Sequence, residues 1–261
     1  MKVAIVCTSN LSHDLSTWIH HHLEIIKINY IFLNLQAEEA PPYVKTHPRI
    51  FCVLDDSTFL GQQKRQVDFV NRCIRNHFQG IDFFLHIDDD ELLVLNKKWA
   101  SIQEYLSGLK WNDERYIRIQ NYEAVLNHPA RPAVPDYFRA TVYFKDPYLD
   151  DFRGYKNGKS IGKASERLYC NGCHTFYGPY KIMDRSDGII LHFDCITFHD
   201  WFKKFQKLAA QPANGVYFDF YKESIGKVRH EKDQGKLKEF WFHHMSRCNH
   251  PIDISLHYKI N

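Results

Sequence analysis

The sequence has no apolar run that approaches the roughly 20 residues of a membrane span. It also has no internal repeat and no low-complexity segment. An excess of charge is missing as well, since 34 Lys and Arg residues against 31 Asp and Glu residues leave a formal net charge of +3. That balance is too small to hold a protein on nucleic acid by bulk charge. We therefore expect no transmembrane segment and no nucleic-acid partner.

Two further absences bear on the cellular compartment. The first apolar run, Val3–Cys7, is brief and gives way to polar residues, so it indicates a first β-strand rather than a signal peptide. The seven cysteines are an odd number dispersed along a long chain, which is typical of reduced thiols. These features predict a cytoplasmic protein.

The composition, 44% hydrophobic and 25% charged, is that of a folded protein with a sizeable core. In the first half, short apolar runs alternate with helical patterns, which predicts an α/β fold with at least partly parallel strands. We expect strands at Val3–Cys7, Asn29–Leu35, Arg49–Leu54, Ile81–Ile87 and Tyr116–Tyr122, and helices at Ser12–Ile25, Gln62–His77 and Trp99–Leu109.

The second half differs in character. Residues 127–167 are rich in proline, glycine and aromatic residues and indicate loops and short strands. An apolar stripe from Phe198 to Leu208 predicts one helix, and Ser224–His244 predicts a second, highly charged one. Acidic and basic residues alternate along that second helix, which is typical of a solvated face, and contact with an anionic membrane surface is the alternative.

Four acids, Asp88-Asp89-Asp90-Glu91, follow directly on an apolar strand. Ligands of open α/β folds bind where strands end, and neighbouring carboxylates repel one another unless a cation is present. Alternate residues of an extended chain point to the same side, so Asp88 and Asp90 are expected to converge on one Mn²⁺ or Mg²⁺ while Asp89 points away. The alternative is a solvated acidic turn that begins the next helix.

The stretch Phe84–Leu92 resembles the pattern of an apolar strand, DxDE and further apolar residues in GT-A glycosyltransferases, especially the family 2 and family 92-like group. Weaker similarities occur in the same order along the chain, at residues 3–10, 18–23, 31–34, 101–106, 158–161 and 191–203. Position 36 departs from the pattern, since Gln36 stands where an acid is common.

The resemblance implies a fold and a reaction. The fold would be GT-A-like, a mixed and mostly parallel sheet flanked by helices, over residues 1–215, with residues 216–261 as a helical extension packed on the same domain. The reaction would move a sugar from a nucleotide-sugar donor, most simply a UDP-sugar, to a hydroxyl of a glycan or glycoconjugate. Mn²⁺ or Mg²⁺ would stabilise the departing diphosphate.

The resemblance also assigns roles to residues. Asp88 and Asp90 would bind the metal, with His192 or His174 as a further ligand, and Lys159 would be a second positive contact for the diphosphate. Asp89 would meet the ribose or the sugar, where it serves binding and catalysis. Thr8, Ser9 and Asp55, at the expected strand ends, would hold the base and ribose. A general base would be a carboxylate, with Asp136, Asp194 and Asp200 as candidates.

Two other functions remain open. A metal-dependent nucleotidyl or phosphoryl transferase would use the same carboxylates. Cys170 and Cys173, spaced as CxxC, would pair with His192 and Cys195 in a zinc-stabilised interaction module without catalytic activity.

Overall fold

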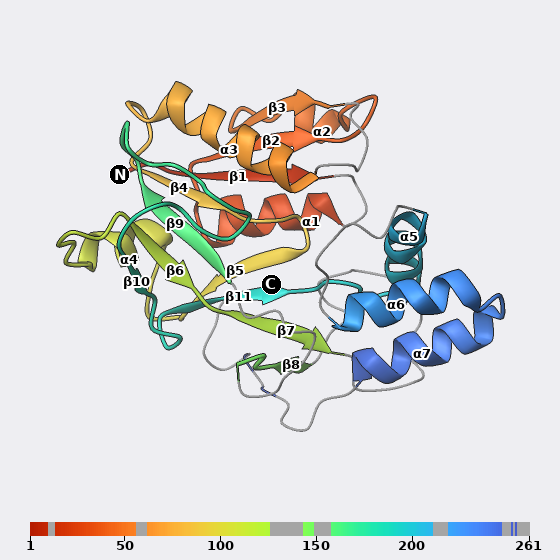
Figure 1. Ribbon diagram of the computed structural model, residues 1–261. Helices are drawn as coiled ribbons and strands as arrows, with labels where there is room; N and C mark the ends of the chain where they lie inside the picture. The colour runs from red at the N-terminus through yellow and green to blue at the C-terminus, as the bar shows by residue number, and fades with distance from the viewer. Residues whose placement is uncertain are drawn as a thin grey trace. The chain divides into compact units, whose positions relative to one another are not determined.

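The computed structural model describes residues 1–9, 14–55, 62–125, 143–148, 158–210 and 219–246, together with residues 252 and 254 (Figure 1). The chain divides into two compact units. The first unit holds residues 1–121, 157–190 and 255–261, and the second holds residues 122–156 and 191–254. The expected division into 1–215 and 216–261 stays a prediction.

The first unit is built on a seven-stranded sheet of order β10-β6-β9-β4-β1-β2-β3. Its strands are β1 (Val3–Ser9), β2 (Tyr30–Leu35), β3 (Ile50–Leu54), β4 (Phe83–His86), β6 (Tyr116–Ile119), β9 (Lys159–Lys163) and β10 (Tyr180–Ile182). The pairs β1–β2, β2–β3, β1–β4 and β10–β6 are parallel, whereas β9 runs antiparallel to β4 and β6. The predicted mixed α/β fold with a mostly parallel sheet is thereby confirmed.

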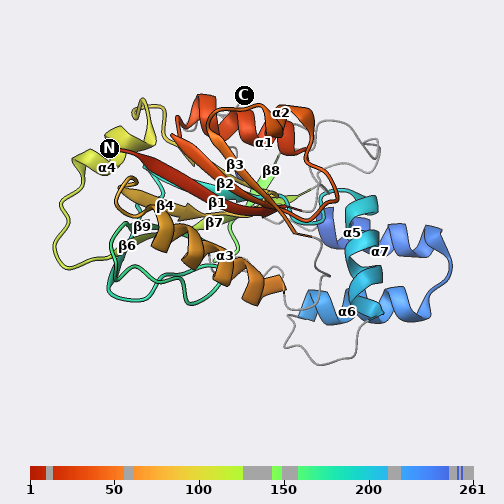
Figure 2. The same cartoon turned by 90° about the horizontal axis from the view of Figure 1, so that it is seen from above.

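Helices cover both faces of this sheet (Figure 2). The helix α3 (Gln62–His77) packs on the face that carries Ala4 and Val6 of β1, and its Phe69 and Val70 belong to that hydrophobic cluster. Helix α1 (Leu15–His20) lies on the other face and continues as a π-helix, η1 (His21–Ile25). Because β1 is buried along its whole length, it reads as a continuous apolar run.

The predicted elements of the first half agree closely with the observed ones. The first helix has a different cap from the expected one. Ser12, the expected cap, lies outside the described residues, and the Asp14 carboxylate caps α1 by accepting the Thr17 N–H at 3.0 Å. The single strand predicted over Tyr116–Tyr122 is wrong, because the chain forms β6 (Tyr116–Ile119) and β7 (Asn121–Val125) there, in different sheets. The elements α2 (Pro42–Lys45) and β5 (Glu91–Leu95) and the π-helical turn carried no expectation. The helix α4 (Ile102–Gly108) falls within its predicted range.

The second unit contains α5 (Phe198–Ala209), α6 (Asp219–His230) and α7 (Gln234–Ser246). Here β7 (Asn121–Val125) pairs antiparallel with β8 (Tyr143–Lys145), and β11 (Gly188–His192) runs across the division between the units. The single helix predicted over Ser224–His244 is wrong. Asp233 interrupts it, because its side chain accepts the Gly235 N–H at 2.8 Å and starts α7 as a new helix.

Among the helices of the described residues, none is both long and apolar enough to cross a lipid bilayer.

Two buried histidines join the π-helix to β5. His22 accepts the Leu93 N–H at its Nε2 (3.2 Å), so its Nδ1 carries the proton and donates to Trp18 O (2.9 Å). His21 donates from Nε2 to Leu93 O at 2.8 Å. Burial lowers the pKa of His21 to about 4, and burial together with His21 lowers the pKa of His22 well below its ordinary value. Both rings are therefore neutral in the folded protein.

This arrangement predicts a loss of stability in mild acid. Below the unfolded-state pKa of about 6.5, both histidines are protonated in the unfolded chain but stay neutral in the folded protein. The free energy of unfolding therefore falls by about 1.4 kcal/mol per pH unit for each ring, until the pH reaches the folded-state pKa. The substitution His21→Gln, which retains an N–H donor, should reduce this slope by about one proton. Urea unfolding between pH 7 and pH 4.5 measures it. At and above pH 7 the free energies of unfolding of the parent and of the variant should depend on pH in the same way. A variant with the parent's slope below pH 7 would contradict the assignment.

Candidate metal centre

The carboxyl ends of four parallel strands meet at one edge of the seven-stranded sheet. In register, Thr8 lies opposite Asn34 and Ser9 opposite Leu35. Asp55 follows β3, donates its N–H to Leu35 O at 2.9 Å and accepts the Asn34 side-chain amide at 3.2 Å. The predicted donor residues Thr8, Ser9 and Asp55 therefore lie at the edge where open α/β sheets bind ligands; their part in binding stays a prediction.

The acids form a tight turn between β4 and β5. Glu91 N–H donates to Asp88 O (3.2 Å), and the Glu91 carboxylate folds back to accept the Asp88 N–H (2.9 Å). From α1, the indole N–H of the buried Trp18 reaches both Asp88 O (3.1 Å) and Glu91 O (2.7 Å). The turn is thus fixed by its own side chain and by a neighbouring helix, and it does not begin a helix.

This turn gathers three carboxylates. Asp88, Asp90 and Glu91 each offer an oxygen, and these oxygens lie within 4.8 Å of one another. Asp89 is directed elsewhere and accepts the Ser9 hydroxyl at 2.6 Å. Asp88 and Asp90 are therefore brought together as expected, and Glu91, for which no role was predicted, joins them. Hard oxygen donors of this number fit Mg²⁺ or Mn²⁺, which keep further positions for water or phosphate oxygens.

The buried ammonium group of Lys159 lies beside these acids. Lys159, on β9, has a fully buried side chain whose Nζ lies 2.5 Å from Asp88 Oδ2, 3.2 Å from Glu91 Oε2 and 3.2 Å from Cys173 O. These three acceptors match the three donors of an ammonium group. The three carboxylates and the one ammonium carry −3 + 1 = −2, which a divalent cation would balance. Lys159 thus contacts the acids themselves, and its predicted contact with the diphosphate stays a prediction.

The charges of this pair stabilise one another. Burial raises the pKa of Asp88, but the Lys159 ammonium, with smaller contributions from His86 and His174, lowers it by more, so the net pKa lies well below its usual range. Burial likewise lowers the pKa of Lys159, and Asp88 with Glu91 outweighs it, so the net shift is upward. The pair is therefore ionised throughout the neutral pH range.

The helix α3 supplies another contact to the turn. Gln66 donates from Nε2 to Asp88 Oδ1 at 3.1 Å, and the Cys173 thiol donates to Gln66 Oε1 at 3.2 Å. Both oxygens of Asp88 are therefore held by the chain. Gln66 sits in an ordinary amphipathic helix, so no sequence pattern distinguishes it.

The zinc alternative finds no support in the part of the chain that the structure describes. There the acidic turn is the one group of three potential metal-binding side chains, and neither Cys170 nor Cys173 belongs to it. Burial raises the pKa of these thiols to about 11 and about 12.

The two histidines predicted as further ligands occupy different environments. His174, in the first unit, donates from Nδ1 to Gly158 O at 3.0 Å, and burial lowers its pKa to about 3, so its ring is neutral. His192 directs Nδ1 to the carboxylate of Glu123, at 2.9 and 3.0 Å, within the second unit. For both, metal binding stays a prediction.

The candidate bases of the second unit take part in local structure. Asp194 accepts hydrogen bonds from Lys204 (2.7 Å) and Tyr221 (3.1 Å). Asp200 caps α5 together with Thr197, whose hydroxyl oxygen accepts the Asp200 N–H at 3.1 Å and whose O–H binds the Asp200 carboxylate. Asp136 lies outside the described residues. The catalytic role of these acids stays a prediction.

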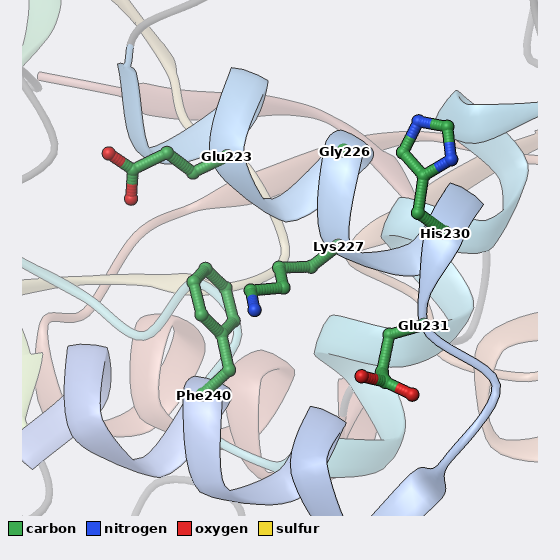
Figure 3. Close-up of a pocket in the computed structure, with 6 residues that line it drawn as sticks. All are labelled: Glu223, Gly226, Lys227, His230, Glu231 and Phe240. Atoms are coloured by element: carbon green, nitrogen blue, oxygen red, sulfur yellow. The ribbon is translucent and has the colours of Figure 1, made fainter.

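A separate cavity of about 480 Å³ opens between α6 and α7 in the second unit (Figure 3). It is lined by Glu223, Gly226, Lys227, His230, Glu231 and Phe240. The Lys227 ammonium lies 5.7 Å from the centroid of the Phe240 ring. None of the predicted site residues lines this cavity, and contact of these helices with a membrane surface stays a prediction.

Comparison with known proteins adds little. No family model matches the chain, and no curated protein matches it. One similar solved structure is 4-diphosphocytidyl-2C-methyl-D-erythritolsynthase from Anaerococcus prevotii DSM 20548, with 10% identity and a TM-score of 0.29 over 94% of this chain and 96% of that chain. A similarity at that TM-score supports no conclusion about fold or chemistry.

Removal of the buried ammonium tests this description of the site. Lys159→Met leaves Asp88 and the fully buried Glu91 without their counter-charge, so the free energy of unfolding should fall by about 3–5 kcal/mol. Lys163→Met, at the exposed end of the same strand, is the matched control and should change it by less than about 0.5 kcal/mol. Denaturant unfolding without added metal measures both. Equal stabilities of the two variants would show that Lys159 is not the counter-charge.

Proposed function

We propose that this protein is a metal-dependent transferase acting on a nucleotide diphospho-sugar, specifically a glycosyltransferase that uses a UDP-sugar and Mn²⁺ or Mg²⁺. The observation that supports it is the acidic turn at the carboxyl ends of parallel strands, where three carboxylate oxygens lie within 4.8 Å of one another. The resemblance of this stretch to the DxDE pattern of GT-A enzymes names the reaction.

The metal would be held by Asp88, Asp90 and Glu91, and when bound it would offset the negative charge that builds on the departing diphosphate. The chain contributes rigidity. Lys159 and Gln66 fix both oxygens of Asp88, and Trp18 fixes the backbone of the turn. Ligands held this way need little reorganisation when the donor binds, which favours tight and well-oriented binding.

Donor recognition would use the same edge of the sheet. Thr8, Ser9 and Asp55 would hold the base and ribose. Asp89, which the Ser9 hydroxyl orients at 2.6 Å, would face the ribose or the sugar. Among the candidate catalytic acids we place Asp89 first, because it belongs to the turn itself. The acceptor would be a hydroxyl of a glycan or glycoconjugate.

The same carboxylates favour a second function equally well. In nucleotidyl transfer a sugar phosphate attacks a nucleoside triphosphate and pyrophosphate departs. A metal held by the acidic turn would offset the negative charge of the departing pyrophosphate in the same way. Products separate the two. Release of UDP from a UDP-sugar with Mn²⁺ supports glycosyl transfer, whereas release of pyrophosphate from a nucleoside triphosphate and a sugar phosphate supports the alternative.

Asp90→Asn tests the proposed metal site. It preserves shape but removes one anionic ligand, so the Mn²⁺-dependent affinity for UDP should fall by at least about 10- to 100-fold, the loss typical of residues that merely support ligands. Asp113→Asn, an exposed acid of the same unit, is the control and should bind as the parent does. Calorimetry with UDP, with and without Mn²⁺, measures the affinity. If the Asp90 variant retained the parent's metal-dependent affinity, the site assignment would fail.

A further inference from the structure

Within the described residues, one edge of the seven-stranded sheet has no further strand beside it and is apolar. The strand β3 ends the strand order beside β2 (Figure 1), and it carries no charged residue and no proline between Ile50 and Leu54. Phe51, Val53 and Leu54 are 49%, 49% and 48% exposed. Native proteins usually protect such an edge with a charge, a proline or a very short strand.

The opposite edge of the same sheet is protected in that way. There β10 is three residues long and has Lys181 at its centre. Tyr180 and Ile182 of β10 are also exposed, so the two edges differ in the length and charge of the strand and not in the exposure of apolar side chains.

The hydrogen-bond pattern shows which groups of β3 face outward. Arg49 O accepts from Ile31 N–H of β2, and Asp55 N–H donates to Leu35 O. Residues of a strand alternate in the side to which they direct their backbone groups, so Phe51 and Val53 also bond toward β2. Ile50, Cys52 and Leu54 therefore direct their N–H and C=O groups away from the sheet.

We propose that β3 pairs with β3 of a second copy of this chain, antiparallel and centred on Cys52, so that two sheets join into one. A twofold axis through Cys52 places residue 50 opposite residue 54 of the other copy, which brings all three outward-facing residues into hydrogen-bonded positions. The two Cys52 residues would exchange both backbone bonds. Leu54 N–H would reach Ile50 O, while Ile50 N–H already donates to His47 O at 3.1 Å.

Charge and side chains agree with this register. Arg49 and Asp55 flank the strand, so each Arg49 would face Asp55 of the second copy. Arg49 already contacts Glu24, and a guanidinium has donors for a further carboxylate. The exposed rings and methyl groups would form cross-strand pairs, Phe51 opposite Val53, of the kind that stabilise sheets. A twofold contact uses the same surface on both copies and so produces a closed dimer. This inference does not rest on the proposed function.

Sedimentation velocity of the full chain over the micromolar concentration range tests the proposal. The parent should be a dimer. Val53→Lys places a charge in the centre of the interface on both copies and should raise the dimer dissociation constant by about tenfold or more. Ile182→Lys places the same charge on the opposite edge, at a residue that is 56% exposed, and should leave the dimer intact. A monomeric parent, or equal dissociation constants for the two variants, would overturn the proposal.

A second measurement decides the register and remains informative if Val53→Lys fails to fold. A short bifunctional maleimide should join two parent chains through Cys52, which is partly exposed. Cys52→Ser should abolish that covalent dimer and leave the sedimenting dimer unchanged. A covalent dimer that persists in Cys52→Ser, or none in the parent, would show that β3 is not centred on its copy.

Discussion

The buried ion pair between Lys159 and the acidic turn is the constraint on which the candidate site depends. The carboxylates of the half-buried Asp88 and the fully buried Glu91 lie close together, and without a cation they would repel one another. The ammonium satisfies both, and Cys173 O takes its remaining donor. A buried charge with a full set of partners is held in one position, so Lys159 favours a single geometry of the turn.

The antiparallel direction of β9 in an otherwise parallel sheet places Lys159 at the acidic turn. With β9 antiparallel to β4, Ser160 lies opposite His86 and Lys159 lies one residue beyond it, level with the beginning of the turn. Ser160 then fixes His174 O with its hydroxyl at 2.6 Å. The loop that carries Cys173 is thereby held over the same ammonium, and three separate segments meet at one charge.

The sequence predicts much of this fold because the central strands are simple. A strand that is buried on both faces is mostly apolar, as Val3–Cys7 of β1 is, and α3 shows a regular helical period. The sequence predicts one helix where α6 and α7 are two, because the capping residue Asp233 cannot be distinguished from the other charged residues of this segment. The short strand β5 was missed because Glu91, a fully buried acid, opens it, and burial of a carboxylate is visible only once Lys159 stands beside it.

The candidate site likewise contains residues that the local sequence predicts and residues that it does not. Four consecutive acids behind an apolar strand are a strong local signal, and the convergence of Asp88 and Asp90 could be predicted from it. Trp18, Gln66 and Cys173 were not, because each contributes through a distant contact that the local pattern does not encode. Those contacts join residues 70 positions apart for Trp18 and Asp88, 71 for Lys159 and Asp88, and 107 for Cys173 and Gln66. During synthesis Asp88 therefore leaves the ribosome 71 residues before its counter-ion does, and the nascent chain carries that anionic segment without its ammonium partner until Lys159 has emerged.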